Sequence, residues 1–235
     1  LPIKIIKKNK YEVINIKGQS EFKPFSYQIP GDISSASFFI VLTLLSKNKI
    51  LKIKNVNLNS SRAGVLKILK MMGGNIKVLN LKNYKGEKIG DILVKSTKKF
   101  KSINLSPRYN SSAIDEFLLI FLVACKSKGT SVFNNLGELN KKESKRLNWG
   151  IKILLQMGIK VKRIKNSGIK IWGQENLNLD KKIIIKNYLK DHRILMVCVI
   201  AGLTLGGNWK IYDHNCYKTS FPSFTKILKN LGARI

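Results

Sequence analysis

The chain has 235 residues, 44% of them hydrophobic, which is enough for one large domain or one and a half ordinary ones with a real core. Its formal net charge is +31, with 44 basic residues against 13 acidic ones. The longest apolar stretch, residues 194–207, is shorter than the ~20 residues of a membrane helix, and the three cysteines show no disulfide framework and no CxxC metal spacing. These features exclude a membrane-spanning protein and a disulfide-stapled secreted domain, and they favour a reducing cytoplasm.

The charge excess comes almost entirely from lysine. Lysine, asparagine and isoleucine are all abundant and have A/T-rich codons, so codon bias spread over a solvated surface is the ordinary explanation. Anionic substrates or nucleic acid are the functional alternatives. Aromatic residues are not interleaved with the basic runs as they are in proteins that bind single strands. The few arginines are therefore more informative than the many lysines; they are Arg62, Arg108, Arg146, Arg163, Arg193 and Arg234.

Residues 1–29 contain two strand-like runs, YEVINIKG and SYQIP. The chain has no initiator Met and begins inside another strand-like run, LPIKII. We therefore expect a piece of a longer protein, in which residues 1–29 are the tail of a preceding unit.

From residue 30 onward one pattern occurs three times. Asp32, Asp115 and Asp191 each open an apolar helix. The letters KIL lie 35, 37 and 35 residues after these aspartates, near the end of a second helix that a glycine terminates. A strand lies between the two helices. Two further strands follow in the first two copies, whereas the third copy stops at ARI.

This repeat predicts an α/β fold of βαβαββ units, at about residues 30–98, 99–174 and 180–235, which together form one lobe. The first helix of each unit is almost wholly apolar, so we expect these helices to be central and buried, with the KIL helices more amphipathic. If the first helices share a direction, their N-termini converge on one face that suits anions.

Polar clusters stand beside these apolar helices. They are PGDISSASF (30–38), SSAIDEF (111–117), GELNKKESKRL (137–147), KDHR (190–193) and KTSFPSF (218–224). Each has an ordinary interpretation as a cap, a turn or a solvated helix start. KDHR is the least ordinary, because the field of a helix N-terminus favours Asp191 but disfavours a cation at Arg193.

Together these clusters, in this order and spacing, resemble the 5-enolpyruvylshikimate-3-phosphate synthase family. The resemblance covers essentially the whole chain but only the C-terminal half of the enzyme. It implies the two-lobed enolpyruvyl transferase fold, an inside-out α/β barrel, of which residues 30–235 would form one lobe. It also implies a reaction in which phosphoenolpyruvate joins the 5-hydroxyl of shikimate 3-phosphate and phosphate leaves.

The resemblance also implies roles for individual residues. Asp115 matches the base that contacts the 5-hydroxyl, and Glu143 matches the residue that shuttles a proton at the methylene carbon. Lys142 matches a lysine shared between the substrates. Arg146 and Arg193 match the two arginines that hold phosphoenolpyruvate, and His192 matches a neighbouring histidine with a weak contact. Lys145 replaces a family aspartate that could orient Arg146.

No cofactor or metal is implied. The expected partners are the two substrates and the missing N-terminal half, without nucleic acid or membrane, in a cytoplasmic monomer. The chain alone is expected to be inactive. Two alternatives stay open: the sister transferase that acts on UDP-N-acetylglucosamine, and a basic nucleic-acid-binding module built on a related α/β repeat.

Overall fold

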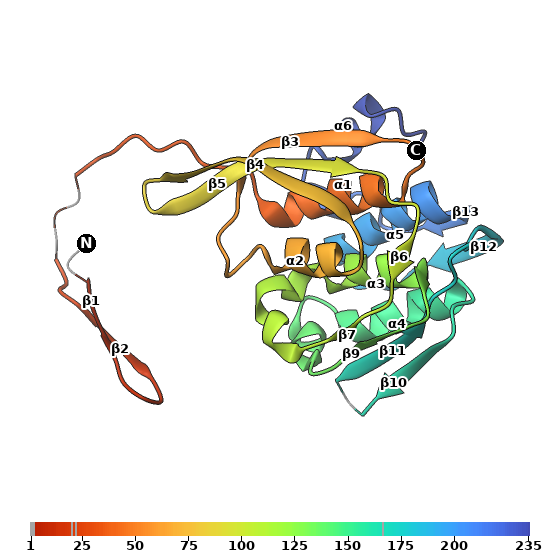
Figure 1. Cartoon of the computed structure of the whole chain (residues 1–235), viewed down its shortest axis with the longest axis horizontal. Coiled ribbons are helices and arrows are strands. Elements are labelled where there is room, and N and C mark those ends of the chain that lie inside the picture. Colours follow the sequence, from red (N-terminus) through yellow and green to blue (C-terminus); the bar gives the residue numbers. More distant parts are fainter. Residues whose placement is uncertain (1–2, 20, 22, 166) are drawn as a thin grey trace.

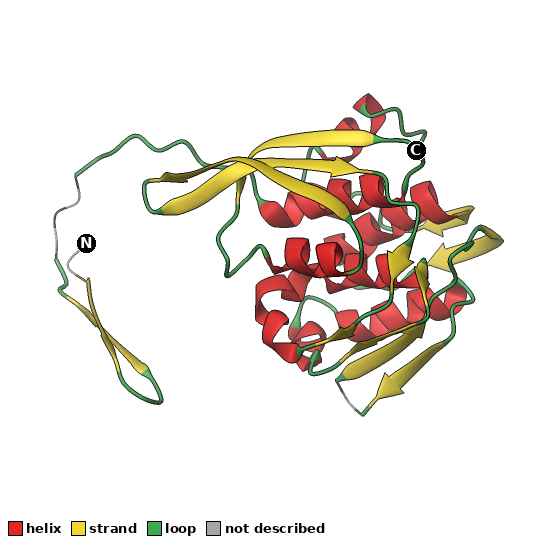
Figure 2. Ribbon diagram, viewed as in Figure 1, coloured by secondary structure: helices red, strands yellow, loops and turns green. Residues whose placement is uncertain are grey.

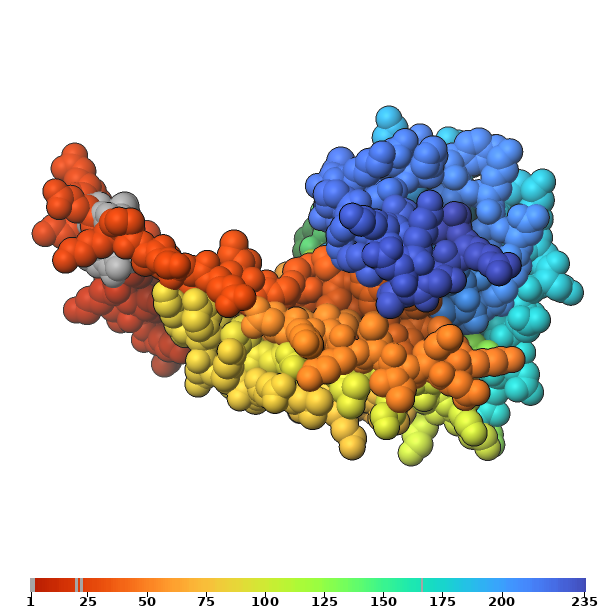
Figure 3. Space-filling view, turned by 90° about the horizontal axis from the view of Figure 1, so that it is seen from above, coloured from red at the N-terminus to blue at the C-terminus, as the bar shows by residue number. Residues whose placement is uncertain are grey.

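The N-terminal part of the chain projects away from the rest of the molecule. The computed structural model describes residues 3–19, 21, 23–165 and 167–235. An antiparallel hairpin of β1 (Ile3–Lys7) and β2 (Glu12–Ile16) lies at the end of an extended segment (Figures 1 and 3). Residues 26–30 form no strand, so the prediction for SYQIP is wrong. Only the next residue, Gly31, forms a single parallel bridge, to Val56.

The first α/β unit follows the expected order. Its elements are α1 (Ile33–Leu45), β3 (Ile50–Asn57), α2 (Gly64–Met71), β4 (Asn75–Tyr84) and β5 (Glu87–Lys95). The strand order in its sheet is β3-β5-β4, with antiparallel pairing throughout. The bridge at Gly31 lies beside β3, so the segment before α1 and the strand after it run parallel, as in a βαβ crossover.

The second unit repeats this arrangement with a longer entry. Its elements are β6 (Phe100–Lys101), β7 (Asn104–Leu105), η1 (Pro107–Tyr109), η2 (Ser111–Glu116), α3 (Phe117–Cys125), β8 (Ser127–Lys128), β9 (Thr130–Phe133), η3 (Gly137–Lys141), α4 (Arg146–Gln156), β10 (Val161–Ile164) and β11 (Gly168–Trp172). Here β7 pairs in parallel with β9, and β11 and β10 follow as the antiparallel pair. Two short strands, β6 and β8, form a separate parallel pair.

The third unit has the parallel strand pair but no further strands. Its elements are β12 (Leu179–Ile185), α5 (His192–Leu205), β13 (Gly206–Ile211), η4 (Cys216–Thr219) and α6 (Phe224–Asn230). β12 and β13 form a two-stranded sheet. Within the described part of the chain, the edge of β13 that faces away from β12 therefore pairs with no strand. The corresponding edges of β3 and β9 pair with β5 and β11.

The helices occupy the centre and the sheets lie outside them (Figure 2). All nine residues of α3 are buried, and α1 buries 11 of its 13. These two helices and α5 contact one another. By contrast, α2 and α4 bury one face each. The expected α/β fold of repeated units around buried first helices is confirmed.

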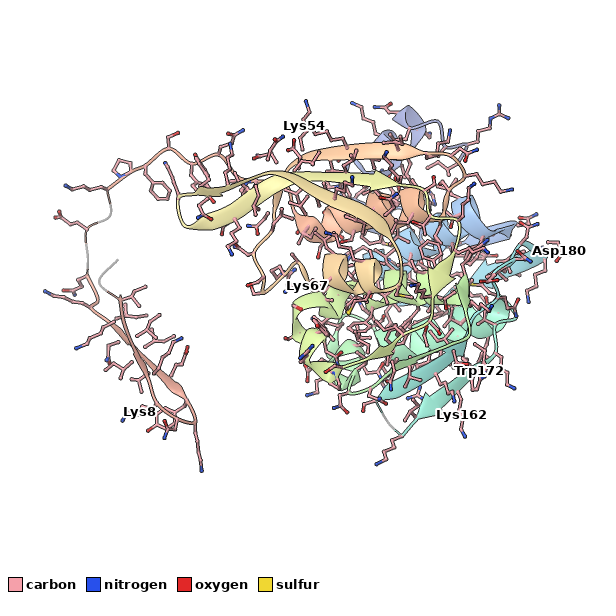
Figure 4. All side chains as sticks on the ribbon, viewed as in Figure 1. Lys8, Lys54, Lys67, Lys162, Trp172 and Asp180 are labelled. Carbon is pink, nitrogen blue, oxygen red and sulfur yellow. The ribbon has the colours of Figure 1, made fainter. Side chains whose placement is uncertain are left out.

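The lysine excess is distributed over the outside of the molecule. Lys8, Lys54, Lys67 and Lys162 are all exposed and lie on widely separated elements (Figure 4). Cys125 and Cys198 are buried free thiols, as their apolar helices predict. No helix in the described residues is long and apolar enough to cross a membrane.

Candidate functional site

The starts of the three central helices lie together, as the repeat predicts. The Ser34 hydroxyl in the first turn of α1 donates a hydrogen bond to Glu116, the residue before α3. Arg193, in the first turn of α5, pairs with the same carboxylate. Side chains from all three units therefore meet at one place.

Two of the three aspartates cap their helices, and one does not. Asp32 accepts hydrogen bonds from the backbone N–H groups of Ser34 and Ser35, and Asp191 accepts one from the N–H of Arg193. The expectation that Asp115 opens α3 in the same way is wrong. Asp115 lies in the short 3-10 helix η2, and α3 has no side-chain cap. The carboxylate of Asp115 is thus free to bind side chains instead of backbone.

Cations from two units surround the Asp115 carboxylate. Its Oδ1 lies 3.2 Å from both Lys142 Nζ and Arg146 Nη1. Its Oδ2 lies 3.8 Å from Arg62 Nη1. Lys142 directly follows η3 and Arg146 begins α4, so the short turn between them sets the spacing of the two cations.

Arg146 is the most deeply buried cation of the cluster, with 2% of its side chain exposed. Its Nε donates to Asp191 Oδ2 at 2.9 Å and its Nη2 to Asp191 Oδ1 at 3.3 Å. Ser144 Oγ donates to the same carboxylate at 2.8 Å. Asp191 therefore orients Arg146, the task that an acidic residue at the position of Lys145 could have performed.

Arg193 lies beside the same cluster, on the side of α1. Its Nη1 donates to the main-chain carbonyl of Asp115 at 3.1 Å and lies 3.5 Å from Glu116 Oε1. The guanidinium thus has an anion and a carbonyl dipole as neighbours. These contacts offset the unfavourable field of the α5 N-terminus.

The other two predicted residues lie at the rim of the cluster. Glu143 is about half exposed and pairs with Arg146 Nη2, three residues along the chain. His192 is half-buried next to Asp191. Burial lowers the pKa of the His192 imidazole, Asp191 raises it and Arg193 lowers it further, with a net lowering that favours the neutral ring near pH 7. All six predicted residues are thus brought together.

The carboxyl groups of the cluster divide into two classes. Burial on its own would raise the pKa of Asp115, but Arg193, Lys142 and Arg146 outweigh burial and hold the pKa below its ordinary value. The pKa of Asp191 is likewise lowered against its burial, by Arg146, Ser144 and the N–H of Arg193. At Glu116 burial prevails over Ser34 and Arg193, so the pKa is raised.

These directions predict how stability responds to acid. The lowered pKa values of Asp115 and Asp191 contribute stability that is present above their ordinary value of 3.8 and is lost as the pH falls through the folded-state values. The raised pKa of Glu116 has the opposite effect on stability. The folded chain binds the Glu116 proton more readily than the unfolded chain does, so this contribution to stability grows as the pH falls. Urea unfolding at about pH 7 and about pH 3 should therefore show a smaller acid loss for Asp115→Asn and a larger one for Glu116→Gln.

Three members of the cluster were not predicted as site residues. The sequence indicates a helix start for Asp191, and it indicates no role for Glu116 beyond its place in the cluster SSAIDEF. Arg62, in the loop before α2, was singled out as one of few arginines but given no role; it also lines a cavity of about 400 Å³ beside residues 27–33. No group of His, Cys, Asp and Glu side chains in the described ranges is arranged to hold a metal ion.

Comparison with known proteins assigns the chain to one family. The family model for EPSP synthase (3-phosphoshikimate 1-carboxyvinyltransferase) matches residues 1–228. The chain belongs to the EPSP synthase family. It is 38% identical over 224 residues to the 3-phosphoshikimate 1-carboxyvinyltransferase of Zymomonas mobilis and 36% identical over 217 residues to that of Petrotoga mobilis, covering 94% and 92% of this chain.

Solved structures agree with this assignment. An EPSP synthase from Acinetobacter baumannii superposes with a TM-score of 0.86 at 31% identity, covering 97% of this chain and 52% of that one. The enolpyruvyl transferase NikO from Streptomyces tendae, at 13% identity and a TM-score of 0.69, covers 99% of this chain and 50% of that one and shares the fold.

The match with the family is to its C-terminal half. The chain covers 49% of the Zymomonas mobilis relative and 48% of the Petrotoga mobilis relative. It thus spans about half the length of the curated relatives it matches.

Proposed function

We propose that the chain supplies one half of an enzyme that transfers the enolpyruvyl group of phosphoenolpyruvate to the 5-hydroxyl of shikimate 3-phosphate and releases phosphate. The observation that carries the proposal is Asp115 where three helix starts meet, in a chain of the EPSP synthase family. Its carboxylate pairs with Lys142 and Arg146, and its main-chain carbonyl accepts a hydrogen bond from Arg193.

Arg146 and Arg193 are suited to bind the anionic groups of phosphoenolpyruvate. A guanidinium presents several donors in one plane and pairs bidentately with carboxylate or phosphate oxygens, which an ammonium group does not. Both guanidiniums have buried carboxylate partners, so little side-chain entropy remains to be lost on binding. Lys142, with about a third of its side chain exposed, would lie between the two substrates.

Asp115 is proposed as the base for the 5-hydroxyl. It takes the hydroxyl proton as the oxygen forms its bond to C2 of phosphoenolpyruvate, while protonated Glu143 gives a proton to the methylene carbon. The C2–O bond to phosphate then breaks, and Glu143 takes a proton back from the methyl group as the double bond forms again. The departing phosphate takes up the proton that Asp115 received, which restores the Asp115 carboxylate. The exposure of Glu143 suits this role because its carboxyl can exchange protons with water.

The lowered pKa of Asp115 keeps its carboxylate ionised near pH 7, which a proton acceptor requires. A lowered pKa also makes a carboxylate a weaker base. When anionic substrates engage Arg146, Arg193 and Lys142, part of the positive field on Asp115 is neutralised, and its pKa rises toward a more effective value.

The partner required for this activity is the other half of the enzyme. We assign residues 30–235 to one lobe with repeats at about 30–98, 99–174 and 180–235, and residues 1–29 to the other lobe. The exposed isoleucines of the hairpin, among them Ile5, Ile14 and Ile16, support that assignment because they form an apolar surface without cover from the described residues. We further propose a cytoplasmic monomer.

The two alternatives have less support. The curated relatives compared above carry the shikimate name, and the likeness to NikO at 13% identity concerns the fold alone. A nucleic-acid module would use its lysines, which are spread over many elements rather than gathered on one.

A half-replacement experiment tests the proposal. The C-terminal half of the Zymomonas mobilis relative is replaced by this chain, and phosphate release is measured with phosphoenolpyruvate and shikimate 3-phosphate. We expect release from the chimera and none from the isolated 235 residues. A folded chimera without activity, or an active isolated chain, would contradict the proposal.

A further inference from the structure

Glu116 is a buried carboxylate for which the proposed reaction has no use. Only 4% of its side chain is exposed. It accepts a hydrogen bond from the Ser34 hydroxyl and lies 3.5 Å from Arg193 Nη1. A buried charge without partners costs several kcal/mol, so the contacts of Glu116 are what stabilise its carboxylate at this position.

The contacts of Glu116 indicate that its carboxylate holds Arg193. The guanidinium has two contacts on the same nitrogen, the Glu116 carboxylate and the main-chain carbonyl of Asp115. The carbonyl fixes the position of Nη1. The carboxylate supplies a negative charge that offsets the unfavourable field on a cation in the first turn of a helix. Without Glu116, Arg193 would keep one neutral acceptor and would be free to rotate toward Asp115 or solvent.

The carboxylate is itself fixed from a second direction. Ser34 Oγ, from the first turn of α1, donates to Glu116, and Arg62 Nη2 lies 3.5 Å from the same hydroxyl. This arrangement parallels the one around Arg146, where Asp191 is fixed by Ser144. Arg146 and Arg193 thus each have their own serine-bound, buried carboxylate.

We propose that Glu116 is a positioning residue that orients Arg193 for phosphoenolpyruvate, with Ser34 holding the carboxylate in place. The proposal rests on the proposed function. It assigns to Glu116 no contact with substrate and no proton transfer, so its loss should weaken the use of one substrate and spare the other.

Steady-state kinetics of the active chimera test this. For Glu116→Gln we expect the KM for phosphoenolpyruvate to rise about tenfold or more, with kcat and the KM for shikimate 3-phosphate within about threefold of the parent. Ser34→Ala should also raise the KM for phosphoenolpyruvate, but by a smaller factor.

Matched controls separate positioning from general loss of packing. Asp91→Asn removes another partly buried, ion-paired carboxylate, on β5, and Ser37→Ala removes a buried hydroxyl one turn further along α1. Neither should change the KM for phosphoenolpyruvate beyond about twofold. An unchanged KM for phosphoenolpyruvate in Glu116→Gln, or equal changes for both substrates, would overturn the proposal.

A spectroscopic measurement on the 235-residue chain distinguishes failure of this proposal from failure of the proposed function. The guanidinium nitrogens of Arg193, assigned by Arg193→Lys, should show hindered rotation in NMR spectra, and Glu116→Gln should abolish it while the signals of Arg146 persist. If Glu116→Gln abolishes the hindered rotation of Arg193 but the parent chimera is inactive, the proposed function fails and the orientation of Arg193 by Glu116 stands. Unaltered Arg193 signals in a folded Glu116→Gln chain would overturn it.

Discussion

Replacing Asp191 with alanine should lower the free energy of unfolding of this chain by roughly 3–5 kcal/mol. The substitution leaves the Arg146 guanidinium buried without its main counter-charge and leaves the Ser144 hydroxyl without its acceptor. It also removes the N-cap of α5, a loss of about 1 kcal/mol by itself. Urea unfolding near neutral pH measures the difference.

Asp32→Ala provides the matched control for this experiment. Asp32 caps α1 through two backbone N–H groups and the Ser35 hydroxyl, but it is exposed and has no buried cation to neutralise. Its loss should cost about 1 kcal/mol. Equal losses for the two variants would show that Asp191 acts as a cap alone and that Arg146 does not depend on it.

Asp115→Asn should reduce the kcat of the active chimera by roughly 10²–10⁴-fold. The amide is close to isosteric with the carboxylate, yet it does not accept the hydroxyl proton. Arg146 keeps Asp191 as its partner, so the chain should remain folded at neutral pH. Initial rates of phosphate release measure the effect.

Asp180→Asn is the control for that result. Asp180 is exposed on β12 (Figure 4), and its substitution should leave kcat within about twofold. If Asp115→Asn retains activity within tenfold of the parent, Asp115 does not serve as the base.

The regular elements could be predicted because each is encoded locally. Glycine after a KIL helix, alternating apolar residues in the strands and an almost wholly apolar first helix each reflect burial of one segment. The equal spacing from aspartate to KIL extends these local signals to the repeat. The prediction of a strand at 26–30 is wrong because a short apolar pattern does not show whether a partner strand is present.

The site was predicted only in part, because its contacts join distant residues. Asp191 and Arg146 are 45 positions apart, and Ser34 and Glu116 are 82 apart. Helix capping and ion pairing use the same aspartate side chain, so spacing alone could not show that Asp115 binds cations while Asp32 binds backbone. The family resemblance names the residues that we propose to contact the substrates, but it does not name the carboxylates that hold Arg146 and Arg193.

Because three helix starts meet, each unit contributes to one set of ion pairs and hydrogen bonds. Ser34 comes from the first unit, Glu116 and Arg146 from the second, and Asp191 and Arg193 from the third. An anion bound at this place would be lost whenever any one unit unfolds locally. Its binding therefore raises the free energy of local unfolding of each of the three units. At an anion concentration of a hundred times Kd the increase is about 2.7 kcal/mol. Protection of backbone amides from hydrogen exchange should then increase together in α1, α3 and α5 rather than around the ligand alone.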